Sequence, residues 1–149
     1  MTEFGLALRE ELPQLVALLG ILFSQESEFM PDDAKQTRAL EKILSDETVG
    51  RIYVARDAGR VVAMATVLYT ISTAEGGMAA LLEDVVVRPG HRGRGVGSAL
   101  LRHVLAEARK QGALRVTLLT DAQNERAQRL YSKLGFEPSS MTAMRLRWK

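Results

Sequence analysis

Hydrophobic residues recur along this chain at two spacings, and the change from one spacing to the other predicts its elements. Apolar positions three and four residues apart indicate helices at 10–24, 34–45, 98–110 and 124–134. Runs rich in valine, isoleucine, tyrosine and threonine indicate strands at 4–8, 51–56, 60–72, 78–88, 114–119 and 141–148. The order β-α-α-β-β-β-α-β-α-β predicts an α/β (α+β) fold, a mixed sheet with helices on both faces.

The length and composition are typical of one compact domain. The 149 residues contain neither an internal repeat nor a linker, so residues 1–149 are interpreted as a single domain. Absence of cysteine excludes disulfides, thiolate metal sites and a cysteine nucleophile. The apolar stretch 15–23 is too short for a membrane span, and Glu3 and Glu10 precede it where a signal peptide is basic. We expect a cytoplasmic protein without a membrane partner.

Charge is distributed unevenly along the chain, although its formal total is only +2. Residues 1–87 carry seven Lys/Arg against fourteen Asp/Glu, whereas residues 88–115 carry seven against one and residues 116–149 carry six against three. Two solvated surfaces of opposite sign explain this pattern most simply. The alternative is a site where an anionic ligand meets the basic middle and a cationic ligand meets the acidic first half.

A glycine-rich segment, Arg92-Gly-Arg94-Gly95-Val-Gly97-Ser98, lies between a predicted buried strand and a helix. Backbone N–H groups in such a loop can converge on an anion without obstruction by side chains, although a simple strand-to-helix turn would look the same. The segment lacks the Lys-Ser/Thr pair of a nucleotide P-loop, and it has serine where a dinucleotide fingerprint has its third glycine. A different phosphate-bearing ligand is therefore expected.

Two motifs in this chain match known patterns. The first, Arg92-x-x-Gly95-x-Gly97, fits the pattern Arg/Gln-x-x-Gly-x-Gly/Ala. The second is Asn124-x-x-Ala-x-x-Leu-Tyr131-x-x-x-Gly-Phe. Together they resemble the pyrophosphate loop and the second signature of the GNAT superfamily of acyl-CoA-dependent N-acetyltransferases, and the order of elements also agrees. The resemblance implies a mostly antiparallel sheet of six to seven strands, in which strands four and five splay apart.

The resemblance further implies acetyl-CoA as the co-substrate, with no metal. The coenzyme would lie between the splayed strands, where backbone groups of Val85, Val86 and Val87 would bind pantetheine as an added strand does. The pyrophosphate and its surroundings would be held by the loop and by one residue of the second motif. These expected cofactor-binding residues are Arg92, Gly93, Arg94, Gly95, Val96, Gly97, Ser98 and Asn124.

Transfer of an acyl group to an amine requires a base for the ammonium and an acid for the departing thiolate. By resemblance, Tyr131 is the acid. Glu83 is interpreted as the base, because the Leu-Glu-Asp run is similar to that of diamine acetyltransferases. Asp84 follows immediately and would face the opposite side unless a bulge intervenes, and a chain of water molecules is a third possibility. His91 and His103 are weaker candidates.

The expected function is direct transfer of acetyl from acetyl-CoA to a primary amine in a ternary complex. The acidic first half favours a cationic acceptor such as a polyamine or a peptide amine, but no residue identifies it. A non-catalytic acyl-CoA-binding module is the alternative. Nucleic acid is not an expected partner, since eight aromatic residues offer little base stacking. The resemblance also implies a homodimer formed through the last strands, around Trp148.

Overall fold

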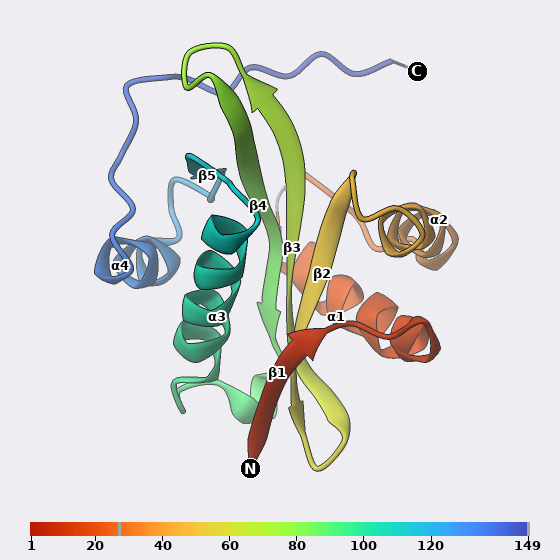
Figure 1. The fold of residues 1–149 in the computed structure, drawn as a ribbon. Helices are drawn as coiled ribbons and strands as arrows, with labels where there is room; N and C mark the ends of the chain where they lie inside the picture. The colour runs from red at the N-terminus through yellow and green to blue at the C-terminus, as the bar shows by residue number, and fades with distance from the viewer. Residues whose placement is uncertain (27, 149) are drawn as a thin grey trace. The chain divides into compact units, whose positions relative to one another are not determined.

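The computed structural model describes residues 1–26 and 28–148, shown in Figure 1. The chain divides into two compact units, Met1–Leu118 and Leu119–Lys149, which are described separately. The first unit contains the whole sheet and three of the α-helices. The predicted α/β (α+β) class, with a mixed and mostly antiparallel sheet, is confirmed.

Among the residues described, the sheet has five strands in the order β1-β2-β3-β4-β5, so neighbours in space are also neighbours in sequence. The first four pair antiparallel, and β5 pairs parallel with β4. The strands span Thr2–Leu6 for β1, Gly50–Asp57 for β2, Arg60–Ser72 for β3, Gly77–Val87 for β4 and Val116–Leu118 for β5. The β4–β5 ladder ends at Leu82 and Leu118, where β5 itself ends, whereas β4 continues to Val87 without a described strand on that side.

Helices α1 (Leu12–Gln25) and α2 (Asp33–Leu44) cover one face of the sheet, and α3 (Val96–Lys110) covers the other (Figure 1). Proline in the first turn favours the start of α1, and the Asp32 side chain caps α2 by accepting from the Lys35 N–H at 3.1 Å. Helices on both faces were predicted, and this is confirmed.

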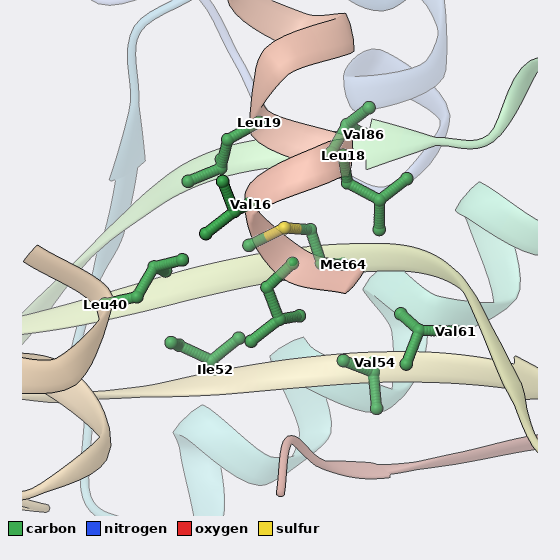
Figure 2. Packing of buried hydrophobic residues seen from close by; sticks show 10 residues of the cluster. Val16, Leu18, Leu19, Leu40, Ile52, Val54, Val61, Met64 and Val86 are labelled. Atoms are coloured by element: carbon green, nitrogen blue, oxygen red, sulfur yellow. The ribbon is translucent and has the colours of Figure 1, made fainter. Parts of the chain in front are cut away.

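The core between α1, α2 and the sheet consists of leucine, isoleucine and valine side chains together with the thioether of Met64 (Figure 2). Leu18 and Leu19 of α1 and Leu40 of α2 pack with Ile52 and Met64 of the strands. Each is nearly excluded from solvent, and burial of one such side chain stabilises the fold by about 2 kcal/mol. No helix of the described residues combines the length and the hydrophobicity needed to cross a lipid bilayer.

The second unit contains one helix, α4 (Glu125–Lys133), and no strand among its described residues. The prediction of a strand at 141–148, and with it a sheet of six to seven strands, is wrong for this structure. The alternation of apolar and polar side chains is present, but a strand also requires a neighbouring strand to satisfy its backbone groups. Met141, Met144, Leu146 and Trp148 are instead exposed.

Candidate functional site

The glycine-rich loop forms a sharp turn into α3. Gly93 and Gly95 have φ angles of 76° and 78°, a left-handed conformation that glycine adopts without the steric cost of a Cβ. Gly95 is the N-cap, so α3 begins at Val96, two residues earlier than predicted. Among residues 1–26 and 28–148, the backbone N–H groups of residues 93–98 make no hydrogen bond of good geometry to a protein acceptor. These donors are available to an anion at the positive end of the helix dipole.

Two arginine side chains next to this loop bind backbone carbonyl groups of the sheet. Arg92 donates from Nε to the Val87 carbonyl oxygen at 3.0 Å, and Arg88 donates from Nη2 to the Val61 carbonyl oxygen at 3.5 Å. Desolvation and the nearby charge of Arg60 lower the pKa of Arg88. The side chain of Arg94 is exposed. Arg92 and Arg94 thus place two positive charges in the loop, and Arg88 places a third just before it.

The end of β4 has one edge that pairs with no strand in the described part of the chain. The Arg88 N–H donates to the Val62 carbonyl at 2.7 Å, and Val86 pairs with Met64 of β3. Because backbone groups alternate along a strand, those of Val86 point toward β3, and those of Val85 and Val87 point toward the side that β5 has left. The edge offered to a ligand is thus formed by Val85 and Val87.

A β-bulge interrupts β4 just before this edge. Met64 pairs with Val86 and Thr66 pairs with Glu83, so two residues of β4 lie opposite the single residue between them on β3. Asp84 is one of the two and has a φ angle of 53°, in the left-handed region. Glu83 was preferred to Asp84 as the base because adjacent side chains of a regular strand face opposite sides of the sheet. The bulge interrupts this regular alternation at Asp84.

The two neighbouring carboxyl groups lie in different environments. Glu83 is exposed, whereas Asp84 is half-buried. Burial raises the pKa of the Asp84 carboxyl to about 6, and the negative charges of Glu83 and Glu26 add to the rise. The Thr66 hydroxyl lowers the pKa of Asp84 and so opposes this rise. Thr66 is 1% exposed, and its hydroxyl makes no hydrogen bond of good geometry with a described residue. Desolvation therefore has the larger effect on the pKa of Asp84.

The second motif lies on and around α4, in the second unit. The Asn124 side chain accepts from the Ala127 N–H at 3.1 Å and so serves as the N-cap of α4. Tyr131 is half-buried, with its ring edge-on to Phe136 at a centroid distance of 5.9 Å. These contacts give both residues a structural role within their unit.

The two histidines occupy separate positions. The His91 Nε2 lies 3.4 Å from the Asp57 Oδ2, which connects the segment before the glycine loop to the β2–β3 turn. The His103 ring stacks on Phe4 at 6.0 Å and meets the Tyr53 ring edge-on at 5.9 Å. His103 is thus part of the packing between α3 and the sheet. No cluster of metal-ligating side chains occurs among the residues described.

A family model described as the Acetyltransferase (GNAT) family matches residues 15–136. The chain belongs to the GNAT acetyltransferase family. A GNAT relative, an uncharacterized N-acetyltransferase from Mycobacterium tuberculosis, is 43% identical over 65 residues, 44% of this chain and 42% of the relative. Glucosamine 6-phosphate N-acetyltransferase from Trypanosoma brucei brucei is 34% identical over 89 residues, 59% of this chain and 58% of that protein. The matches span about half the length of these relatives.

Solved GNAT structures have the same fold. Glucosamine-6-phosphate N-acetyltransferase from Arabidopsis thaliana superimposes with a TM-score of 0.76 at 22% identity, covering 98% of each chain. A predicted acetyltransferase from Clostridium acetobutylicum, solved with acetyl-CoA, gives a TM-score of 0.80 at 18% identity, covering 98% of this chain and 96% of that one. The sequence raised a bulge only as an exception to the choice of Glu83, and it gave no sign of the environment of Asp84, since it shows only two adjacent acids in a strand.

Proposed function

We propose that this GNAT chain transfers an acetyl group from acetyl-CoA to a primary amine of a cationic acceptor, directly and in a ternary complex. Two neighbouring features carry the proposal: the loop amides, for which no acceptor occurs among the described residues, and the edge of β4 beyond Leu82, which pairs with no described strand. A diphosphate fits the first and an amide-containing chain fits the second. Acetyl-CoA has both parts, and its thioester supplies the acetyl group.

Different residues of the first unit bind different parts of acetyl-CoA. The amides of residues 93–98 hold the diphosphate, and the loop arginines add positive charge. Val85 and Val87 offer their backbone groups to pantetheine, while those of Val86 remain in the sheet. No heavy atom of the described residues, the adjacent residues aside, lies within 4 Å of a Cβ built at Gly93 or Gly95, which supports space for the ligand above the loop.

Asp84 suits the role of general base better than Glu83 does. A base works best when its pKa lies near the operating pH, and burial raises the pKa of Asp84 to about 6. Its carboxylate, ionised at neutral pH, holds the acceptor ammonium, takes its proton and passes it to water. Exposed Glu83 contributes negative charge near the site. The left-handed backbone at Asp84 is a strained conformation of the kind that is concentrated at functional sites.

Tyr131 remains our candidate for the acid that protonates the departing thiolate, a role that the second motif supports. A tyrosine hydroxyl retains its proton near neutral pH and can donate it as negative charge develops on sulfur.

Negative charge around Asp84 supports a cationic acceptor. Glu83 and Glu26 both act on this carboxyl, and residues 1–87 as a whole carry an excess of seven negative charges. A second positive charge on the acceptor would interact favourably with this region.

A screen of diamines, aminoglycosides, amino acids and peptides, followed by thiol release from acetyl-CoA, tests the proposal. We expect amine-dependent release, fastest with acceptors that carry two or more positive charges. If calorimetry detects acetyl-CoA binding but no amine accelerates thiol release, the chain is an acyl-CoA-binding module instead. If acetyl-CoA does not bind, the assignment of the loop and the edge is wrong as well.

A further inference from the structure

The contact between Arg92 and Val87 lies at the junction of the two features on which the proposed function rests. Arg92 immediately precedes the glycine loop, yet its side chain reaches back to β4, where Nε donates to the Val87 carbonyl at 3.0 Å. That carbonyl belongs to the open edge, not to the β3–β4 ladder. In this conformation a side chain covers an acceptor that an added strand would use.

The anion-binding amides are close to the same carbonyl. A Cβ built at Gly97 would lie 3.2 Å from Val87 Cγ2, so the first turn of α3 packs directly on the end of β4. The side chain of Arg92 is exposed and can move without disrupting the core. A guanidinium has five N–H donors and binds phosphate oxygens more strongly than a neutral carbonyl.

We propose that Arg92 covers the pantetheine edge of β4 until a diphosphate draws its guanidinium away. Arg92 is thereby a specificity-determining residue: the site favours thioesters that carry a diphosphate over phosphate-free thioesters. The inference rests on the proposed function, because it assumes that one ligand occupies both the loop and the edge. A ligand with a diphosphate exchanges the Arg92–Val87 bond for a charge-assisted one. A ligand without phosphate must also break the Arg92–Val87 hydrogen bond, but it offers the guanidinium no replacement acceptor of comparable strength.

The test compares wild type, Arg92→Ala and Arg94→Ala for binding of CoA and of phosphate-free pantetheine, read from NMR shifts of the Val85 and Val87 amides. Arg94→Ala is the matched control, since it removes the same charge from the loop and leaves the Arg92–Val87 bond. A net hydrogen bond corresponds to about a two- to tenfold change in affinity. We expect Arg92→Ala to bind pantetheine about threefold more tightly and CoA at least threefold more weakly. Arg94→Ala should weaken CoA without strengthening pantetheine.

Inorganic pyrophosphate supplies a second readout that needs no thioester. It should shift the Val87 carbonyl ¹³C resonance in wild type and in Arg94→Ala, and leave it unchanged in Arg92→Ala, where the bond is already absent. Equal weakening of CoA and pantetheine by Arg92→Ala would overturn the inference. The inference would also be overturned if pantetheine bound to none of the variants, or if pyrophosphate left the Val87 carbonyl resonance of the wild type unchanged. Absence of CoA binding in wild type would instead refute the proposed function.

Discussion

Asp84 has two unfavourable properties that a residue chosen for stability alone would avoid. Its backbone is left-handed, at a φ of 53°, and its carboxyl is desolvated beside two other acids. Aspartate and asparagine tolerate this backbone conformation better than most residues. A change from aspartate to asparagine therefore isolates the charge from the conformation.

Asp84→Asn should gain stability and lose activity. A carboxyl whose pKa rises from 3.8 to about 6 on folding destabilises the ionised protein by up to about 3 kcal/mol. The unfolded chain binds fewer protons than the folded one between these values, so wild-type stability falls as pH rises from about 4 to 6. We expect Asp84→Asn to raise the free energy of unfolding at pH 8 by about 1–3 kcal/mol, to leave it unchanged at pH 3, and to slow acetyl transfer about 100-fold or more.

Urea unfolding at the two pH values and the pH profile of kcat/KM provide the measurements. Wild-type activity should rise with pH through about 6. The Thr66 hydroxyl lowers the pKa of Asp84, so Thr66→Val should move this inflection to higher pH while the rate at pH 8 is retained. Unchanged turnover in Asp84→Asn would return the role of base to Glu83 or to water.

Tyr131→Phe separates the proposed acid from the packing of its ring. The phenyl group keeps the edge-on contact with Phe136, so the fold of the second unit should be retained. We expect turnover to fall about 100-fold while the affinity for acetyl-CoA changes less than about twofold, measured by thiol release and by calorimetry. Tyr69→Phe on β3 is the matched control and should have wild-type turnover. Full activity in Tyr131→Phe would exclude this hydroxyl as the acid.

At the scale of elements, the junction of β4 and α3 depends on the conformation of the glycine loop. Gly95 is left-handed, and nothing lies within 4 Å of a Cβ built there, so Gly95→Ala introduces backbone strain without a clash. We expect a loss of about 1–2 kcal/mol in stability and a larger loss in acetyl-CoA affinity, because relief of the strain moves the amides of the loop. Thermal unfolding and calorimetry measure the two effects.

Gly90→Ala is the control for this change. Gly90 also has open space around it, but its φ angle is not positive. The free energy of unfolding of Gly90→Ala should therefore stay within about 0.5 kcal/mol of the wild-type value. Equal losses in the two variants would show that the left-handed turn is not the cause.

A partly buried ion pair connects the segment before α1 to β2. Glu11, which is 6% exposed, accepts from Arg56 Nε at 2.7 Å, from Arg56 Nη2 at 2.8 Å and from the Leu8 N–H at 2.8 Å. The Arg56 hydrogen bond lowers the pKa of Glu11. The ion pair therefore contributes its full stabilisation of the fold above pH 4.5, the ordinary pKa of a glutamate. This stabilisation is lost as the pH falls through the lowered pKa of Glu11.

Glu11→Gln should destabilise the protein by about 3 kcal/mol at pH 7, because Arg56 loses its carboxylate partner in a poorly solvated position. The difference from wild type should shrink in acid below the folded pKa. Chemical denaturation between pH 2.5 and 7 measures this, with the exposed neighbour Glu10→Gln as control. A loss that is independent of pH would point to packing instead of charge.

For the whole molecule, the segregation of charge predicts how salt affects catalysis. An acidic first half and a basic middle attract a cationic acceptor and an anionic coenzyme respectively. Raising NaCl from 20 to 300 mM should increase the KM of the best cationic acceptor at least about threefold and leave kcat nearly unchanged. The reason is that salt screens the attraction between the acceptor and the enzyme during binding. A neutral acceptor of similar size should show little change. Equal salt dependence for both would remove the electrostatic argument for a cationic acceptor.

Local patterns predicted most of this molecule, and pairing between distant segments accounts for what they did not predict. Helix periodicity and the glycine motif are readable over a few residues, so α1 to α4 and the loop were found within two residues of their ends. The bulge at Asp84 is a register shift between β3 and β4, and the Arg92–Val87 bond is a contact across a turn. Neither leaves a periodic signal. Residues 141–148 show the converse, a strand pattern without a partner strand.

The agreement between strand order and chain order has a consequence for how this protein folds. From β2 to β4 the sheet is a continuous meander joined by short turns, so its loops close at little entropic cost. Only β1 and β5 must find their neighbours across long intervening segments. We therefore expect residues 50–87 to form the folding nucleus on a ribosome-bound chain, before α3 and β5 have been synthesised, and the parallel β4–β5 pairing to be completed last.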